Sequence, residues 1–271
     1  MSAALARRMP VLFIGHGNPM NAIERTEFRR SWEELGRRLP RPKAVVCISA
    51  HWETRGVCLT ASGRPETIHD FYGFPQALFE VQYPAPGDPA LARRTKERIS
   101  SLDARLDPER GLDHGAWSVL LAMYPEADIP VVQLSLDTSR PGGFHYALAR
   151  ELRPLRDEGV LILGSGNIVH NLRLFSYHDP TAPDWAVRFD GEIKGRIAAR
   201  DHEALMSYGT LGPDARLAVP TPEHYYPLLY ALALQDEGEP LSFFNSTVLS
   251  SISMTSVLIG DPRDPVTGGM V

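Results

Sequence analysis

The sequence is poor in cysteine, with only Cys47 and Cys58 among its 271 residues. Both lie in apolar runs, and two thiols cannot build the disulfide framework of a small secreted protein. The first nine residues carry Arg7 and Arg8 but lack the apolar stretch that follows the basic region of a secretory signal. We therefore expect a cytoplasmic protein.

Long apolar runs and an excess of positive charge are also missing. No stretch approaches the length of a membrane-spanning helix, and the formal net charge is -5 with an isoelectric point near 6.0. This balance argues against nucleic acid and anionic membranes as partners. The apolar content of 43% is typical of a globular protein that buries a substantial core. We expect a monomer or a small homo-oligomer.

Apolar runs alternate with amphipathic stretches along the whole chain. The apolar runs predict strands at residues 10–14, 44–50, 56–61, 130–136, 160–163, 241–244 and 252–259. Apolar residues at helical spacing predict helices at residues 26–39, 90–102, 118–124, 144–158, 183–200 and 225–234. The alternation predicts an α/β fold, a single domain over residues 1–271 (core about 10–260) with a largely parallel or mixed central sheet flanked by helices.

Two histidines follow predicted strands. His16 stands in a Gly-His-Gly turn after residues 10–14, and His51 comes directly after residues 44–50. The glycines permit backbone conformations closed to other residues, so the His16 imidazole is carried off the end of its strand. Because open α/β sheets bind ligands at the carboxyl ends of their strands, we expect His16 and His51 to meet there as metal ligands.

His224 and His170 are further candidates for this site. His224 lies in the first turn of a predicted helix, with Thr221 as its cap and Pro222 at the first helical position. A neutral imidazole there can point into a crevice and bind a metal. His170 follows a Gly-Ser-Gly turn after a strand, as His16 follows a glycine turn, and it can be an acid/base group or a ligand.

Two histidines have alternative interpretations. His114 lies between Asp113 and a glycine before a predicted helix, so the pair is either part of the site or a helix cap. His69 and Asp70 belong to an aromatic loop at residues 67–75, where a substrate contact and a loop-stabilising role are both open. Basic side chains near this loop are candidates for holding a substrate carboxylate. The remaining three are expected to be solvated: His145, His178 and His202.

Familiar nucleotide and nucleophile signatures are not met. Gly164-Ser165-Gly166 lacks the third glycine of a dinucleotide fingerprint, the lysine of a phosphate-binding loop and the full Gly-x-Ser-x-Gly of a nucleophile elbow. No Cys-x-x-Cys or His-Glu-x-x-His motif occurs. The functional hypothesis therefore depends on the histidines.

The histidine motifs together resemble a known family, the class III extradiol ring-cleavage dioxygenases, in the bacterial branch similar to 4,5-DOPA dioxygenases. The resemblance extends in order from about residue 10 to about residue 259. The motifs that carry it are Gly15-His16-Gly17-Asn18-Pro19-Met20, Ser49-Ala50-His51-Trp52, Asp113-His114-Gly115, Gly166-Asn167-Ile168-Val169-His170-Asn171 and Pro222-Glu223-His224-Tyr225.

The resemblance implies one divalent metal ion in the crevice of a mixed α/β sheet. His16, His51 and His224 match metal ligands of the family. His170 matches the catalytic acid/base, which can also approach the metal, and His114 matches a second active-site histidine that contacts substrate; we assign His69 to substrate binding as well. The implied reaction opens the ring of a DOPA-like catechol with dioxygen to give a semialdehyde, using Fe(II).

One position departs from part of the family and leaves alternatives open. Protocatechuate-cleaving relatives complete the ligand set with a carboxylate, whereas this chain has His224 with Glu223 beside it. Two histidines and a carboxylate are typical of non-haem Fe(II) oxygenases, but three histidines are equally suited to zinc. The alternatives are a zinc-dependent hydrolase or lyase on the same site and a non-enzymatic metal-binding module.

Overall fold

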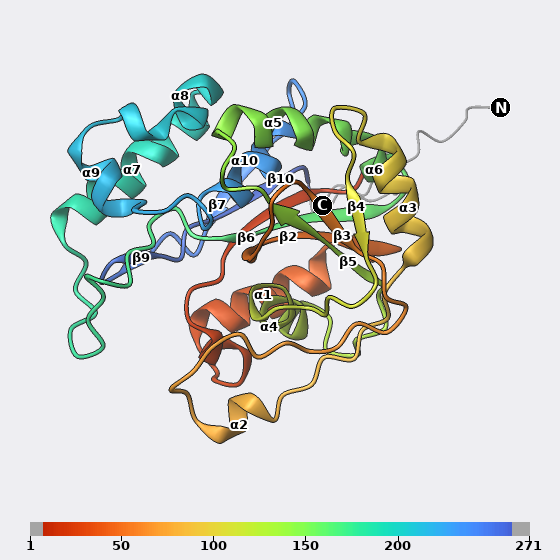
Figure 1. Cartoon of the computed structure of the whole chain (residues 1–271). Helices are drawn as coiled ribbons and strands as arrows, with labels where there is room; N and C mark the ends of the chain where they lie inside the picture. Colours follow the sequence, from red (N-terminus) through yellow and green to blue (C-terminus); the bar gives the residue numbers. More distant parts are fainter. Residues whose placement is uncertain (1–7, 262–271) are drawn as a thin grey trace, which may run out of the picture.

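The computed structural model describes residues 8–261, through which one mixed sheet of eight strands runs (Figure 1). In spatial order the strands are β4, β3, β5, β2, β6, β1, β10 and β7. Their bounds are β1 Val11–Gly15, β2 Ala44–Glu53, β3 Cys58–Thr60, β4 Arg105–Asp107, β5 Val131–Leu136, β6 Val160–Gly166, β7 Leu241–Phe244 and β10 Ser256–Ile259. A separate two-stranded sheet pairs β8 Val248–Leu249 with β9 Ile252–Ser253.

The four central strands, β5, β2, β6 and β1, are parallel to one another. At one side β10 and β7 continue the sheet antiparallel, and at the other β3 is antiparallel to β5 and parallel to β4. This arrangement confirms the expected α/β class with a mixed sheet. The extent of the domain, residues 1–271, stays a prediction. Within residues 8–261 no helix is long and apolar enough to cross a membrane.

Helices cover both faces of the sheet. In Figure 1, α1 and α4 lie on one side and α5, α6 and α10 lie on the other. The helix bounds are α1 Glu27–Arg38, α2 Gln76–Phe79, α3 Pro89–Arg98, α4 His114–Met123, α5 Gly142–Glu151, α6 Arg153–Asp157, α7 Asp184–Ala198, α8 His202–Met206, α9 Pro213–Ala218 and α10 Tyr226–Ala233, with short 3-10 turns η1 Pro19–Ala22 and η2 Tyr208–Thr210.

Strand β1 shows how the sheet separates two apolar cores. Val11 and Phe13 belong to the core under α5 and α10, whereas Leu12 and Ile14 belong to the core that contains Trp32 of α1. Successive side chains of a strand point to opposite faces, so a strand covered on both faces is apolar at every position. This is why continuous apolar runs predicted the central strands.

Three predicted elements differ from the structure. The helix expected at residues 144–158 is two helices, α5 and α6, because Pro154 has no N–H with which to continue the helical hydrogen bonds. The strand expected at residues 252–259 is divided into β9 and β10. The helix expected to start at Thr221 begins only at Tyr226, and the Thr221 hydroxyl donates a hydrogen bond to the Glu223 carboxylate instead of capping a helix.

His145 is fully buried, so the expectation that it is solvated is wrong. It lies on the face of α5 that packs against α10. Its Nε2 donates to the carbonyl of Asp137 at 3.1 Å, and its Nδ1 accepts from the Tyr230 hydroxyl at 3.1 Å. His202 is half-buried and contacts the Tyr146 hydroxyl. The contacts that bury His145 fully and His202 partly join segments that are distant in sequence. A local sequence pattern does not reveal such contacts.

The burial of His145 predicts a pH dependence of stability. Burial lowers the pKa of His145 from 6.5 to about 4, so between these values the unfolded chain binds a proton that the folded chain does not. The free energy of unfolding therefore falls as pH decreases from 6.5 towards 4. We expect His145→Gln to reduce the loss between pH 7 and pH 5 by about 2 kcal/mol.

Urea unfolding at the two pH values measures this difference. His178→Gln is the matched control, because His178 is exposed, and it should leave the loss unchanged. An unchanged loss in His145→Gln would contradict the prediction.

Candidate metal centre and active site

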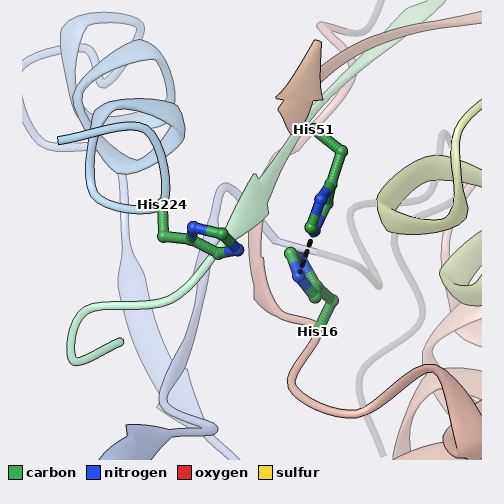
Figure 2. A group of neighbouring side chains, drawn as sticks. All are labelled: His16, His51 and His224. Carbon is green, nitrogen blue, oxygen red and sulfur yellow. Dashed lines mark hydrogen bonds between the residues drawn. The ribbon is translucent and has the colours of Figure 1, made fainter. Parts of the chain in front are cut away.

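Three histidines from distant parts of the chain face one another at the carboxyl end of the sheet (Figure 2). His16 follows β1, His51 lies near the end of β2, and His224 precedes α10. One ring nitrogen of each lies within 4.8 Å of the others. The parallel register of β1, β6 and β2 ends these strands side by side, with Gly15 opposite Gly166, so the side chains beyond them converge.

Hydrogen bonds fix which nitrogen faces the centre in His16 and in His224. Ser165 donates its only hydroxyl proton to the carbonyl of Gly115 at 2.6 Å, so its oxygen accepts from Nδ1 of His16 at 3.0 Å. Nδ1 of His224 donates to the Glu223 carboxylate at 3.0 Å. In both rings the proton is on Nδ1, and the lone pair is on Nε2.

The Nε2 atoms are arranged as a metal would require. Nε2 of His16 and Nε2 of His51 lie 3.2 Å apart, and Nδ1 of His51 faces an Asp70 carboxylate oxygen at 3.6 Å. Nε2 of His224 is buried and has no hydrogen-bond partner within the described residues. A buried acceptor without a partner is unfavourable unless a cation lies beside it. The donor set therefore fits a divalent ion held by three imidazoles.

Burial keeps these imidazoles in the form that binds metal. It lowers the pKa of His16, His51 and His224 well below the usual value, and the neighbouring imidazoles lower it further. Only the neutral ring has a lone pair to donate, so the three rings are available as ligands at neutral pH.

His114 and His170 lie against the three converging histidines. The ring of His114 is 3.9 Å from that of His51, centroid to centroid, and the ring of His170 stacks on that of His224 at 3.4 Å. His114 is the first residue of α4, and Asp113 caps that helix by accepting from the amide of Ala116. The cap interpretation of Asp113 is therefore confirmed, and the role of His114 in the site stays a prediction. Burial lowers the pKa of His170 to about 4.

These five histidines line one cavity of about 360 Å³. Aromatic side chains from two loops form much of the remaining wall. Phe71, Tyr72 and Phe74 come from the loop at residues 67–75, and Phe175 and Tyr177 come from the loop after His170. Tyr72 and Tyr177 are 92% and 78% exposed, which places them at the rim. A planar aromatic molecule can enter between such walls.

His69, expected to bind substrate, is not among the residues that line the cavity. Its Nε2 donates to the carbonyl of Val81 at 2.9 Å, and its ring packs against Trp117. These contacts correspond to the loop-stabilising alternative. Sequence reasoning missed the partners of the histidines, above all Ser165. The Gly-Ser-Gly turn signalled Ser165, but its contact with His16 depends on β6 lying beside β1.

Comparison with known proteins agrees with this geometry. Residues 10–257 match the family described as the catalytic LigB subunit of aromatic ring-opening dioxygenase. The chain is 48% identical over 264 residues to a protein named 4,5-DOPA dioxygenase extradiol from Escherichia coli K12, covering 93% of this chain and 95% of that one. It is 41% identical over 243 residues to a protein of the same name from Beta vulgaris, covering 87% and 90%.

A crystal structure of an uncharacterized protein from Escherichia coli K12 is similar over 93% of this chain and all of that one, with a TM-score of 0.82 and 44% sequence identity. The chain belongs to the LigB family of aromatic ring-opening dioxygenases. Its class is that of the extradiol ring-cleaving dioxygenases, as the sequence motifs predicted.

Substitution of Gly166 tests the metal centre. A Cβ atom at this position would lie 2.1 Å from the carbonyl oxygen of His224. Gly166→Ala therefore has to displace the His224 segment, and we expect a loss of about 1–3 kcal/mol in the free energy of unfolding together with weaker metal binding. Thermal unfolding and metal content after dialysis measure the two effects.

Gly191→Ala is the matched control, because Gly191 lies in α7 with no atom within 4 Å of the added Cβ. Alanine also favours a helix. Full metal occupancy in Gly166→Ala after dialysis would contradict the close-packing explanation.

Proposed function

We propose that this dioxygenase opens the ring of a catechol, with a divalent metal held by His16, His51 and His224. The observation that carries the proposal is the convergence of His16, His51 and His224 on a cavity with aromatic walls. Nε2 of His224 is buried there and has no hydrogen-bond partner among the described residues. The relatives named 4,5-DOPA dioxygenase support a DOPA-like catechol.

A bound Fe(II) ion would supply the one-electron chemistry that dioxygen requires, which zinc does not supply. We propose Fe(II), one ion per chain, as the active metal and Zn(II) as a metal that the three histidines also accommodate. A cytoplasmic location stays an inference from the two cysteines, both free and buried. A monomer or small homo-oligomer is likewise our expectation.

His170 and His114 supply the proton transfers in this proposal. His170 is neutral at neutral pH and lies against His224, so it can accept a proton from a catechol hydroxyl and return it later as a general acid. His170 also has a ring nitrogen within 4.8 Å of His224, so it is close enough to approach the metal. His114 has Nδ1 bound to Asp70, which leaves its Nε2 to hydrogen-bond a substrate oxygen.

Reconstitution with iron tests the reaction class. The metal-free protein is loaded anaerobically with Fe(II), then exposed to air and to L-DOPA or catechol. We expect oxygen uptake and a yellow ring-opened semialdehyde, and neither with Zn(II). Metal bound at one site without oxygen uptake across a panel of catechols would favour the zinc hydrolase or lyase, and no turnover of any kind would favour a metal-binding module.

His170→Ala tests the proton-transfer role. General acid/base groups typically contribute 10²–10⁴-fold, so we expect turnover to fall by about 100-fold or more with metal content unchanged. His178→Ala is the control, since His178 is exposed and is not among the residues that line the cavity. Turnover at the original rate in His170→Ala would remove His170 from the mechanism.

The charge of the cavity predicts a preference among catechols. Asp70 lines the cavity, and no lysine or arginine does so among the residues that the structure describes. The expected basic partner for a substrate carboxylate is therefore not seen there. A carboxylate on the ring meets Asp70 without a compensating cation, whereas an ammonium side chain is attracted to Asp70 and to aromatic faces.

We expect kcat/KM for dopamine to exceed that for 3,4-dihydroxybenzoate by about tenfold or more, with uncharged 4-methylcatechol between them. Equal or better use of the benzoate would contradict this preference. In that case Arg173, exposed beside the cavity residue Leu172, is the side chain to substitute.

A further inference from the structure

Asp70 joins the aromatic loop to the site. One carboxylate oxygen, Oδ1, accepts hydrogen bonds from the backbone amide of His114 at 2.9 Å and from its ring Nδ1 at 3.0 Å. The other oxygen, Oδ2, lies 3.6 Å from Nδ1 of His51. The side chain is 22% exposed and lines the cavity. One carboxylate therefore faces both a proposed metal ligand and a proposed substrate-binding histidine.

The loop at residues 67–75 has anchors other than Asp70. At its base, Thr67 pairs with Leu112 in a β-bridge, and the amide of Ile68 donates to the carbonyl of Leu112. Trp117 Nε1 donates to the carbonyl of Ile68, and His69 donates to Val81. On the N-terminal side of Asp70 the loop is thus held by bonds that do not involve its carboxylate, and on the other side the ring of Phe71 packs against Phe79 and Trp117.

Helix α4 does not need Asp70 as a cap either. Asp113 already accepts from the amide of Ala116 in the capping position. The ring of His114, by contrast, has no hydrogen-bond partner for Nδ1 other than Asp70 among the described residues. Its remaining contacts are ring packing against His16, His51 and Phe71, which do not distinguish one ring nitrogen from the other.

We propose that Asp70 is a positioning residue that fixes His114 in the tautomer with Nδ1 protonated and Nε2 directed to the substrate. Through its second oxygen it favours the same tautomer in His51, whose Nε2 then faces the metal centre. This inference rests on the proposed function for its effect on turnover. The tautomer itself can be measured without turnover. We therefore expect substitutions of Asp70 to change kcat more than KM.

The spectroscopic test is the imidazole ¹⁵N spectrum of the protein loaded with diamagnetic Zn(II). The signals of His114 are assigned by their loss in His114→Gln. We expect a pure Nδ1–H tautomer in the wild-type protein and a mixture with the Nε2–H tautomer in Asp70→Ala. Asp70→Asn keeps an oxygen acceptor and should retain more of the Nδ1–H form. An unchanged His114 tautomer in Asp70→Ala overturns the proposal.

The kinetic test uses the Fe(II)-loaded protein with 4-methylcatechol, whose uncharged methyl group has no charge interaction with Asp70. We expect Asp70→Ala to lower kcat by about 10- to 100-fold while KM changes by less than about threefold, with Asp70→Asn between the two. Glu66→Gln is the matched control, since it removes one exposed charge directly before the loop and its side chain makes no hydrogen bond in the described structure. A rise in KM with kcat unchanged, or Asn no better than Ala, overturns the positioning role.

The two tests separate this proposal from the proposed function. If the wild-type protein opens no catechol, the reaction assignment fails, and the tautomer measurement still decides whether Asp70 controls His114. If the wild-type protein is active and Asp70→Ala is equally active, the reaction assignment stands and the role of Asp70 fails.

Discussion

The first turn of α4 holds the active site together through buried hydrogen bonds to three strands. The carboxylate of Asp113 accepts from Ser49 of β2 at 2.6 Å and from the Gln133 amide of β5 at 2.7 Å. Next along the turn, the carbonyl of Gly115 accepts from Ser165 of β6. All of these side chains are fully buried, so breaking one bond leaves a desolvated polar group that water cannot reach. The spacing of the strand ends therefore depends on this turn.

The same turn explains how a strongly apolar sheet carries a polar site. Strands β2 and β6 are apolar where they form the two cores and carry hydroxyl groups only near their carboxyl ends, at Ser49 and Ser165. Each of these groups reaches both the α4 turn and a histidine: Ser165 contacts His16, and Ser49 accepts from the amide of His51. Packing five imidazoles together removes polar ring atoms from water, and a ligand bound only by the folded chain offsets that cost.

The sequence predicted the parts of the structure that are encoded locally. The central strands are covered on both faces and appear as apolar runs. The rule that ligands bind at strand carboxyl ends predicts that His16 and His51 lie together. The partners were not predictable in this way, because Ser165 reaches His16 only when β6 inserts between β1 and β2. Asp70 and His114, which form a hydrogen bond, are 44 residues apart in sequence. His145 is buried against α10, and its partner Tyr230 in that helix is 85 residues further along the chain.

The placement of the carboxylates explains how a site with three imidazoles can serve a reaction on a diol. Glu223 and Asp70 lie behind His224 and His51, each facing an Nδ1 atom. From there they orient the rings and raise the basicity of Nε2 without occupying a coordination position. A divalent ion between the three rings would retain its full charge towards the cavity, where it favours a doubly ionised catechol. A carboxylate ligand would neutralise part of that charge. In the proposed function, Glu223 behind His224 rather than on the metal would therefore strengthen the attraction for the diol oxygens and leave the ring substituents to the aromatic walls.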